Sequence, residues 1–260
     1  MKSLFAGYYR PTDKEFDELW KNCTFVFDTS VLLDLYRSTA TTRDVLLDLL
    51  EKIKDRIWLP YQAGWEYQEN RLKVIAEERE LYSELRKALD GLVKDVQQKM
   101  HNHAVESADK IKAELEAAVR KTVAIIDKAA NEHPDLTADD HIRDKITQLF
   151  EGMVGTKLDD KRLVSIYQEG PKRYEQKIPP GYKDVEKGGT RQFGDLVIWN
   201  EILDYAKTSN KPVVLVTSDT KEDWWWRTRA IHVWAQTRAR SGSVRLCSDK
   251  VLHVHGREVC

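Results

Sequence analysis

The chain has 260 residues, of which 41% are hydrophobic and 33% charged, a composition typical of a charge-rich globular protein. The formal net charge of -1 provides no overall basic field, so any site for a polyanion must be a local patch. The three cysteines show no C-x-x-C spacing, which argues against a disulfide framework and a zinc site and favours a reducing cytoplasm. No segment has the apolar run of a signal peptide or the roughly 18 apolar residues of a membrane span, so we expect a soluble cytoplasmic protein.

The first part of the chain is predicted to form a strand–helix–strand unit. Residues 12–15 (Thr-Asp-Lys-Glu) have the pattern of a capping box and predict a short helix before the first strand. Residues 25–27 form a continuous apolar run, typical of a strand buried on both faces, and the run ends at Asp28. A helix over 41–54 and a short strand over 56–60 follow, which is the order of a parallel crossover unit.

The middle of the chain is predicted to form a pair of long helices. A helix begins after Pro60, and apolar residues recur at spacings of three and four up to Met100. After a break at 101–103, a second run over 108–129 has the spacing of a coiled-coil seam. Two such helices joined by a short break predict an antiparallel hairpin, and a further helix is expected over 137–150.

The last third of the chain is predicted to return to the sheet. Residues 152–190 are rich in Gly, Pro and Lys and are predicted to be irregular. A helix is predicted to open at Gly194, and 213–217 has the clearest pattern of a buried strand. Beyond Arg227 the periodicity degrades. Residues 244–247 could form an edge strand, and no element is predicted over 251–260.

Two acidic residues follow predicted strands of the same sheet. Asp28 ends the first strand and Asp219 follows the last, and the carboxyl ends of parallel strands meet at one edge. Glu66 lies early in the helix after the second strand, and Asp195 lies at the start of the helix before the last strand. Both are expected to reach the same cleft, with Asp223 as a candidate fifth carboxylate.

Such a cluster of acids predicts a metal site. Four or five carboxylates cannot all ionise in one pocket without a counter-charge, and Mg²⁺ or Mn²⁺ supplies one through oxygen ligands. A pair of divalent ions can activate water and stabilise both oxygens of a phosphodiester displacement, so we predict metal-dependent phosphodiester hydrolysis. The candidates for binding the phosphate backbone are Arg37, Arg71, Lys183 and Lys221.

Each of these residues also has a simpler interpretation. Asp28 or Asp195 alone could be a helix cap, Asp219 a turn residue, and Glu66 part of a solvated helix face. The tryptophans at 224–226 could stack on bases or belong to the core. The functional interpretation depends on the conjunction of strand-end acids on one edge of the sheet.

Four blocks of the chain resemble the PIN-domain nucleases. The match is to the four acid-bearing segments of that family, in order, and the chain is most similar to a bacterial PIN-like subgroup with a large helical insertion. The resemblance covers roughly 23–75 and 178–226. The blocks are Phe25–Leu33, Leu59–Glu66, Gly194–Trp199 and Val216–Asp219.

The resemblance implies a Rossmann-like three-layer α/β/α sandwich with a parallel sheet. Residues 1–75 and 178–260 would form the nuclease domain and 76–177 the helical insertion. It also implies an endoribonuclease, or a nuclease acting on DNA, that uses Mg²⁺ or Mn²⁺ and leaves a 5′-phosphate. Roles as a toxin or in defence against phage occur among similar proteins. One departure is that those proteins continue with a helix and a strand that 228–260 does not resemble, so an edge strand is expected to be missing.

Two rival hypotheses remain open at this point. A haloacid-dehalogenase-like phosphatase also opens with an apolar strand ending in Asp, but it needs a second Asp two residues on, where this chain has Ser30. A non-catalytic module with a degenerate site would work through the helical hairpin instead. The hairpin itself could position nucleic acid, mediate a homodimer or bind a partner protein, or be a plain structural spacer.

Overall fold

The computed structural model describes residue 1 and residues 12–101, 106–228 and 231–235. The chain divides into two compact units, one formed by Met1–Asn70 with Ile142–Cys260 and the other by Arg71–His141. Residues 142–177, which the sequence analysis assigns to the insertion, group with the first unit. That unit contains every strand that the structure describes.

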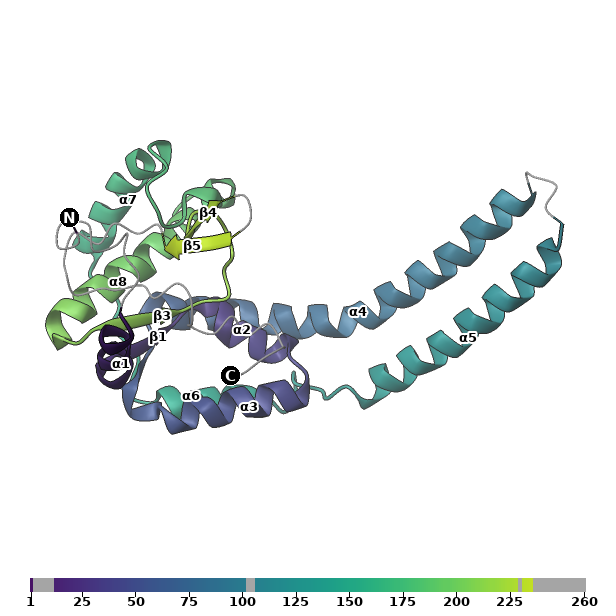
Figure 1. The fold of residues 1–260 in the computed structure, drawn as a ribbon, viewed down its shortest axis with the longest axis horizontal. Helices are drawn as coiled ribbons and strands as arrows, with labels where there is room; N and C mark the ends of the chain where they lie inside the picture. The colour runs from purple at the N-terminus through teal and green to yellow at the C-terminus, as the bar shows by residue number, and fades with distance from the viewer. Residues whose placement is uncertain (2–11, 102–105, 229–230, 236–260) are drawn as a thin grey trace. The chain divides into compact units, whose positions relative to one another are not determined.

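A parallel sheet of three strands lies at the centre of the first unit (Figure 1). The strand order is β2-β1-β3, with β1 between its two parallel neighbours. All four residues of β1 and of β3 are buried, as the continuous apolar runs predict. The predicted α/β fold with a parallel sheet is confirmed. The strands are β1 (Thr24–Phe27), β2 (Ile57–Trp58) and β3 (Val213–Val216).

Helices cover both faces of this sheet (Figure 1). On one face, Phe27 of β1 contacts Phe150 of α6, with ring centroids 5.7 Å apart. Val26 is the register partner of Trp58 and points to the opposite face, where Trp58 stacks on Tyr205 of α8 at 4.2 Å. The helices of this unit are α1 (Asp13–Asn22), α2 (Thr29–Arg37), α3 (Ala40–Lys52), α6 (His141–Phe150), α7 (Asp160–Glu175) and α8 (Gly194–Ser209).

Local sequence signals account for several helix ends. The capping box predicted before α1 is present, since the Thr12 and Glu15 side chains each accept a backbone N–H of the other residue. The helix predicted from Thr137 begins later, at His141. Asp135 accepts both the backbone N–H and the hydroxyl of Thr137. Thr137 therefore belongs to a turn before the helix and does not cap it.

The prediction that 152–190 is irregular is wrong, because this segment contains α7. Asp159 caps the helix by accepting the backbone N–H of Arg162 at 2.7 Å. Two buried residues of α7, Ile166 and Tyr174, then pack in a hydrophobic cluster with the start of α8. The short 3-10 helices η3 (Tyr182–Lys187) and η4 (Arg191–Phe193) connect α7 to α8.

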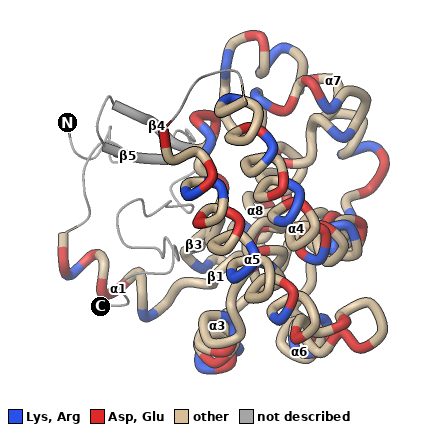
Figure 2. The backbone as a smooth tube through the Cα atoms, turned by 90° about the vertical axis from the view of Figure 1, so that its right-hand side faces the viewer, with Lys and Arg blue, Asp and Glu red and all other residues tan. Residues whose placement is uncertain are grey.

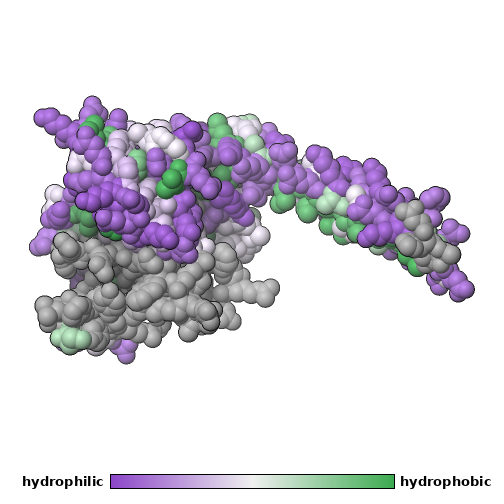
Figure 3. Space-filling view, turned by 90° about the horizontal axis from the view of Figure 1, so that it is seen from above, coloured by the Kyte–Doolittle hydropathy of each residue, from purple (hydrophilic) through white to green (hydrophobic). Residues whose placement is uncertain are grey.

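The second unit consists mainly of two antiparallel helices. These are α4 (Tyr61–His101), which begins in the first unit, and α5 (Ala108–Glu132). Tyr82 pairs with His133 near one end, and Gln97 pairs with Glu116 near the other, each at 3.0 Å. Charges of both signs are spread along the two helices (Figure 2), and hydrophobic side chains gather along one edge (Figure 3). The exposed apolar residues of this unit include Leu72, Leu81, Leu85, Leu92, Ile111 and Ile125.

The segment after the tryptophan block forms an antiparallel pair, β4 (Trp225–Thr228) and β5 (Ile231–Ala235). The sequence analysis found no clear periodicity beyond Arg227, so it did not predict β5. The possible strand over 244–247 and the rest of 236–260 lie outside the described residues. Within the part of the chain that the structure describes, no helix combines the length and apolarity needed to cross a bilayer.

Candidate active site

Asp28 lies where β1 ends and α2 begins, and its side chain makes no capping hydrogen bond to that helix. Its Oδ2 instead accepts the hydroxyl of Ser30 at 2.6 Å and the hydroxyl of Thr217 at 2.9 Å. Thr217 directly follows β3, so these bonds join the carboxyl ends of β1 and β3. The carboxylate is buried, with 8% of the residue exposed. Asp28 is therefore held toward the sheet edge rather than used as a cap.

Asp219 lies in the loop that follows β3, next to the same hydroxyl groups. Its backbone N–H donates to Thr217 Oγ1 at 3.0 Å, and the neighbouring Ser218 N–H donates to Ser30 Oγ, also at 3.0 Å. Asp219 Oδ1 accepts the backbone N–H of Lys221 at 2.7 Å, which fixes the turn. The structure thus brings Asp28 and Asp219 to one edge of the sheet.

Glu66 lies on the second turn of α4, within the first unit. Its two carboxylate oxygens accept the Thr29 hydroxyl at 3.1 Å and the Gln62 side-chain amide at 2.8 Å. Gly194, the first residue of α8, approaches so closely that a Cβ there would overlap Glu66 Oε1. Backbone conformation does not require this glycine, since its φ of -52° is ordinary for a helix.

Asp195 lies in the first turn of α8, where its Oδ2 accepts the indole N–H of Trp224 at 3.0 Å. Trp224 is buried, so this ring belongs to the core. Gly181, which has a φ of +88°, also approaches Asp195, because a Cβ at Gly181 would lie 3.0 Å from the Asp195 Cβ. Asp195 is therefore contacted by two other segments, the turn at Gly181 and the loop that contains Trp224.

The carboxyl groups of this site raise one another's pKa. Burial is the largest cause for Asp28, Glu66 and Asp195, and each pKa lies above its usual value. The negative charge of Asp28 further raises the pKa of Glu66 and of Asp195. The negative charge of Asp219 further raises the pKa of Asp28. These mutual effects indicate that the four predicted acids form one electrostatic cluster.

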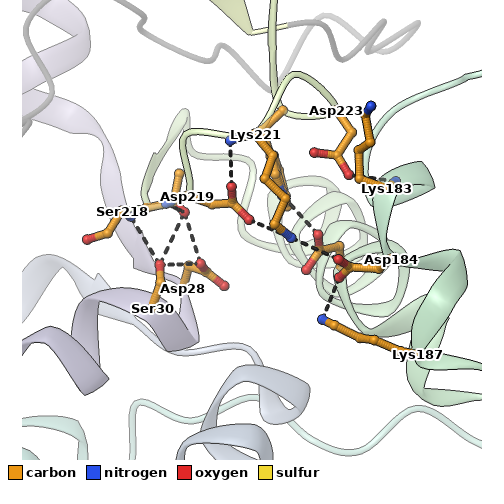
Figure 4. A network of polar contacts seen from close by, with 12 residues as sticks. Asp28, Ser30, Lys183, Asp184, Lys187, Ser218, Asp219, Lys221 and Asp223 are labelled. Atoms are coloured by element: carbon orange, nitrogen blue, oxygen red, sulfur yellow. Dashed lines mark hydrogen bonds and ion pairs between the residues drawn. The ribbon is translucent and has the colours of Figure 1, made fainter. Parts of the chain in front are cut away.

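A chain of ion pairs runs beside this cluster (Figure 4). The ammonium of Lys221 lies 3.1 Å from Asp219 Oδ2 and 2.9 Å from Asp184 Oδ1. Asp184, in η3, pairs through its other oxygen with Lys187 at 2.5 Å. Burial alone would raise the pKa of Asp184, but the two ammonium groups outweigh burial and lower it.

Asp223, the candidate fifth carboxylate, is completely buried. Its Oδ2 accepts the backbone N–H of Lys183 at 3.0 Å, which ties the loop after β3 to η3. Its Oδ1 is buried and has no hydrogen-bond partner among the described residues. Burial raises the pKa of this carboxyl group.

Three of the four predicted phosphate-binding residues have carboxylate partners away from the acid cluster. Arg37 pairs with Asp34 one turn earlier on α2 at 3.4 Å, and Lys183 pairs with Glu222 at 2.5 Å. Arg71 belongs to the second unit, where it forms an ion pair with the buried Asp140. The fourth, Lys221, is the one that the structure brings to the acids.

Sequence reasoning missed the residues that hold the acids in place. Ser30 and Thr217 carry hydroxyl groups in motifs already singled out, so their position next to the acids was an available signal. Asp184 lies directly after Lys183, which was chosen in its place. Glu201, on the buried face of α8, accepts the backbone N–H of Gln62 at 3.1 Å and thereby caps α4. Nothing in the sequence indicates this contact.

The donor chemistry of the site fits a hard divalent cation, because every candidate ligand is a carboxylate. A bound cation would also offset the repulsion among Asp28, Glu66 and Asp195. It could likewise provide a partner for the buried Oδ1 of Asp223, which has none among the described residues. Within the described residues, however, no three His, Cys, Asp or Glu side chains are grouped so that they could hold one ion. An ion bound here would need some carboxylates to turn toward it.

The acids lie where open α/β sheets bind their ligands, beyond the carboxyl ends of the parallel strands. The chain belongs to the PIN like domain family, whose model matches residues 24–236. Members of that superfamily are generally nucleases, and PIN domains generally use divalent metals. Searches of curated proteins and of solved structures found no significant match.

Proposed function

We propose that this protein is a metal-dependent endoribonuclease that hydrolyses phosphodiester bonds with Mg²⁺ or Mn²⁺. The observation that carries the proposal is the cluster of Asp28, Glu66, Asp195 and Asp219 at one edge of the sheet, in which burial and neighbouring carboxylate charges raise the pKa of Asp28, Glu66 and Asp195. A divalent cation offsets that repulsion through oxygen ligands. Family membership supports the same class of reaction.

In this proposal the chain's own residues fix the acids and receive the substrate. Ser30 and Thr217 orient Asp28, while Thr29 and Gln62 orient Glu66. The ion, when bound by these carboxylates, supplies Lewis-acid chemistry for water and phosphate oxygens. The ammonium of Lys187, which is 55% exposed and pairs with Asp184 at 2.5 Å, could exchange this partner for a phosphate of the backbone.

An assay with and without metal tests the proposal. Purified protein is incubated with RNA and with single-stranded DNA, in Mn²⁺ or in EDTA. We expect internal cleavage of RNA that requires Mn²⁺ and that falls at least about 100-fold in Asp28→Asn. Asp34→Asn, an acid on the outer side of the same helix, is the matched control and should cleave as wild type does.

Two outcomes would contradict the proposal. One is no cleavage by wild type with metal, and the other is equal cleavage by Asp28→Asn. Release of phosphate from a small monoester would indicate a phosphatase instead. Action in the cytoplasm and a role as a toxin or in phage defence belong to the same proposal, and cell growth after induced expression tests the toxin role.

We propose that the helical unit, Arg71–His141, binds a protein partner. Its exposed apolar residues, among them Leu81, Leu85 and Leu92, support a homodimer or a complex with another protein. Light scattering of the purified protein distinguishes a monomer from a dimer. Binding of RNA along the same helices is the competing proposal, and it predicts lower RNA affinity when the helices are shortened.

A further inference from the structure

The ammonium of Lys221 lies at the centre of the strongest concentration of negative charge in the candidate site. It bridges two carboxylates from different segments, Asp219 after β3 and Asp184 in η3, at 3.1 and 2.9 Å (Figure 4). Asp195 is also close enough to favour its charged form. A single positive charge therefore already neutralises part of the acid cluster.

Asp184 is the fixed end of this bridge. Its residue is 6% exposed, and its backbone N–H donates to Gly181 O at 3.0 Å, which closes the turn that begins η3. Its second oxygen is occupied by Lys187 at 2.5 Å. Asp184 was not among the predicted metal ligands, whereas Asp219 was. Lys221 therefore joins one acid that is dedicated to ion pairing and one that is a candidate for binding metal.

We propose that Lys221 is a positioning residue that acts as an internal counter-ion, which shares Asp219 with the divalent cation and moves wholly onto Asp184 when the cation binds. The identity of the ion rests on the proposed nuclease function. The two cations would compete because both would draw on the carboxylate of Asp219, and because an ammonium next to a divalent ion is electrostatically unfavourable.

The ammonium of Lys221 is held from two sides, at 3.1 Å from Asp219 Oδ2 and at 2.9 Å from Asp184 Oδ1. The side chain nevertheless remains 42% exposed, which leaves it room to move between partners. Removal of the ammonium should therefore have two opposite effects, a less stable metal-free protein and tighter metal binding.

The test compares Mn²⁺ affinity in metal-free protein by calorimetric titration at pH 7. We expect Lys221→Met, and the second neutral variant Lys221→Gln, to bind Mn²⁺ about tenfold more tightly than wild type, with a lower Tm before metal is added. Lys221→Arg keeps the charge and should stay within about threefold of wild type. Lys54→Met is the matched control, since it removes an exposed ammonium that pairs with Glu51 at 2.7 Å, and it should leave the affinity unchanged.

A double-mutant cycle tests the role of Asp184. Asp184→Asn alone should weaken Mn²⁺ binding about threefold or more, because Lys221 then depends on Asp219 alone. In a Lys221→Met background the same change should have little effect. Equal effects in both backgrounds would mean that Asp184 does not act through Lys221, and would overturn its part in the proposal.

These titrations are independent of catalysis, so the two proposals can fail separately. If wild type cleaves RNA with Mn²⁺ but Lys221→Met binds Mn²⁺ no more tightly, the counter-ion role is wrong and the nuclease proposal stands. If wild type cleaves nothing, tighter Mn²⁺ binding by Lys221→Met still supports the counter-ion role. Absence of binding in every variant overturns it.

Discussion

Asp28 is a buried carboxylate whose two hydroxyl partners hold it beside Asp219. Its pKa is raised, first because burial disfavours the charge and second because Asp219 repels it. A raised pKa means that the folded protein binds this proton more tightly than the unfolded chain does. Ionisation of Asp28 at neutral pH therefore reduces the free energy of unfolding.

We expect Asp28→Asn to raise the free energy of unfolding of the metal-free protein at pH 7 while it abolishes cleavage. The amide has the same shape and can accept the Ser30 and Thr217 hydroxyls without the buried charge. A gain of about 1 kcal/mol, or about 2–4 °C in Tm, is the usual size for relief at a functional position. Thermal unfolding in EDTA measures it, with Asp34→Asn as the exposed control. A fall in Tm would contradict this account of Asp28.

Glu201 connects α8 to the start of α4 and carries a pKa raised to about 7. Burial is the main cause. The hydrogen bond from the Gln62 backbone works against it, and the charge of Glu66 adds to the rise. The sign of the pH effect follows from linkage. The stability contributed by a carboxyl with a raised pKa is fully present below about 4.5 and is lost as pH rises through about 7.

We expect Glu201→Gln to flatten the pH dependence of stability between about pH 4.5 and 7. The difference across that window should reach at most about 3.5 kcal/mol, since one pKa unit corresponds to about 1.4 kcal/mol. Urea unfolding at several pH values measures it in wild type and variant. Asp144→Asn, at an exposed position of α6, should keep the wild-type slope. Parallel slopes for wild type and Glu201→Gln would refute the assignment.

For individual residues, the sequence predicts the carboxylates of the candidate site better than it predicts the residues that hold neighbouring segments in place. Asp28 and Asp219 could be found because an apolar run that ends in an acid is visible without any contact information. Asp184 and Glu201 could not, because each acts across a long sequence separation, on Lys221 and on Gln62. Isolated charged residues of this kind are normally solvated, and only tertiary contacts distinguish them.

Helices and strands, too, are predictable from the sequence where local patterns determine them, and not where tertiary packing does. The strands β1 and β3 and the helix α8 were predictable because periodicity and burial agree over their whole length. In α7, Gly170 and Pro171 suggested a loop, yet Gly170 lies in the helix where a Cβ would overlap Phe193. The absence of a side chain at Gly170 allows α7 to pack closely against Phe193 of η4. In the sequence alone, such a glycine is indistinguishable from one that ends a helix.

At the contact between α8 and α4, we expect Gly194→Ala to weaken metal binding without unfolding the protein. Alanine is acceptable to the backbone there, but its Cβ would displace Glu66 Oε1. Mn²⁺ affinity and the cleavage rate should each fall about tenfold, with Tm within about 3 °C of wild type.

Gly91→Ala on α4 is the matched control for that change. A Cβ at Gly91 meets nothing within 4 Å, so only helix propensity changes. This variant should gain about 0.5–1 kcal/mol of stability and bind Mn²⁺ as wild type does. Unchanged metal binding in Gly194→Ala would show that Glu66 tolerates displacement, and that Glu66 is not a ligand.

For the whole molecule, the sequence predicted the parallel sheet and the two long helices from their different periodicities. It did not predict the β4–β5 pair, because two strands of four and five residues leave too short a pattern to recognise. The candidate acids all lie in the unit formed by Met1–Asn70 and Ile142–Cys260. The helical unit of Arg71–His141 contributes none of them, which suggests a direct test of its role.

Replacement of residues 86–127 by a short Gly-Ser linker should leave metal binding intact. The shortened hairpin keeps the Tyr82–His133 contact at 3.0 Å and the ion pair of Arg71 with Asp140 at its base. Arg71→Ala, in contrast, leaves buried Asp140 without that partner and should cost about 3 kcal/mol. We therefore expect the truncation to shift Tm by less than Arg71→Ala does, with Mn²⁺ affinity within about twofold of wild type.

Cleavage of a short RNA should persist in the truncated protein. A loss of cleavage confined to long RNA would assign the hairpin to substrate positioning. Loss of Mn²⁺ binding in a folded truncation would contradict the placement of the whole site in the other unit.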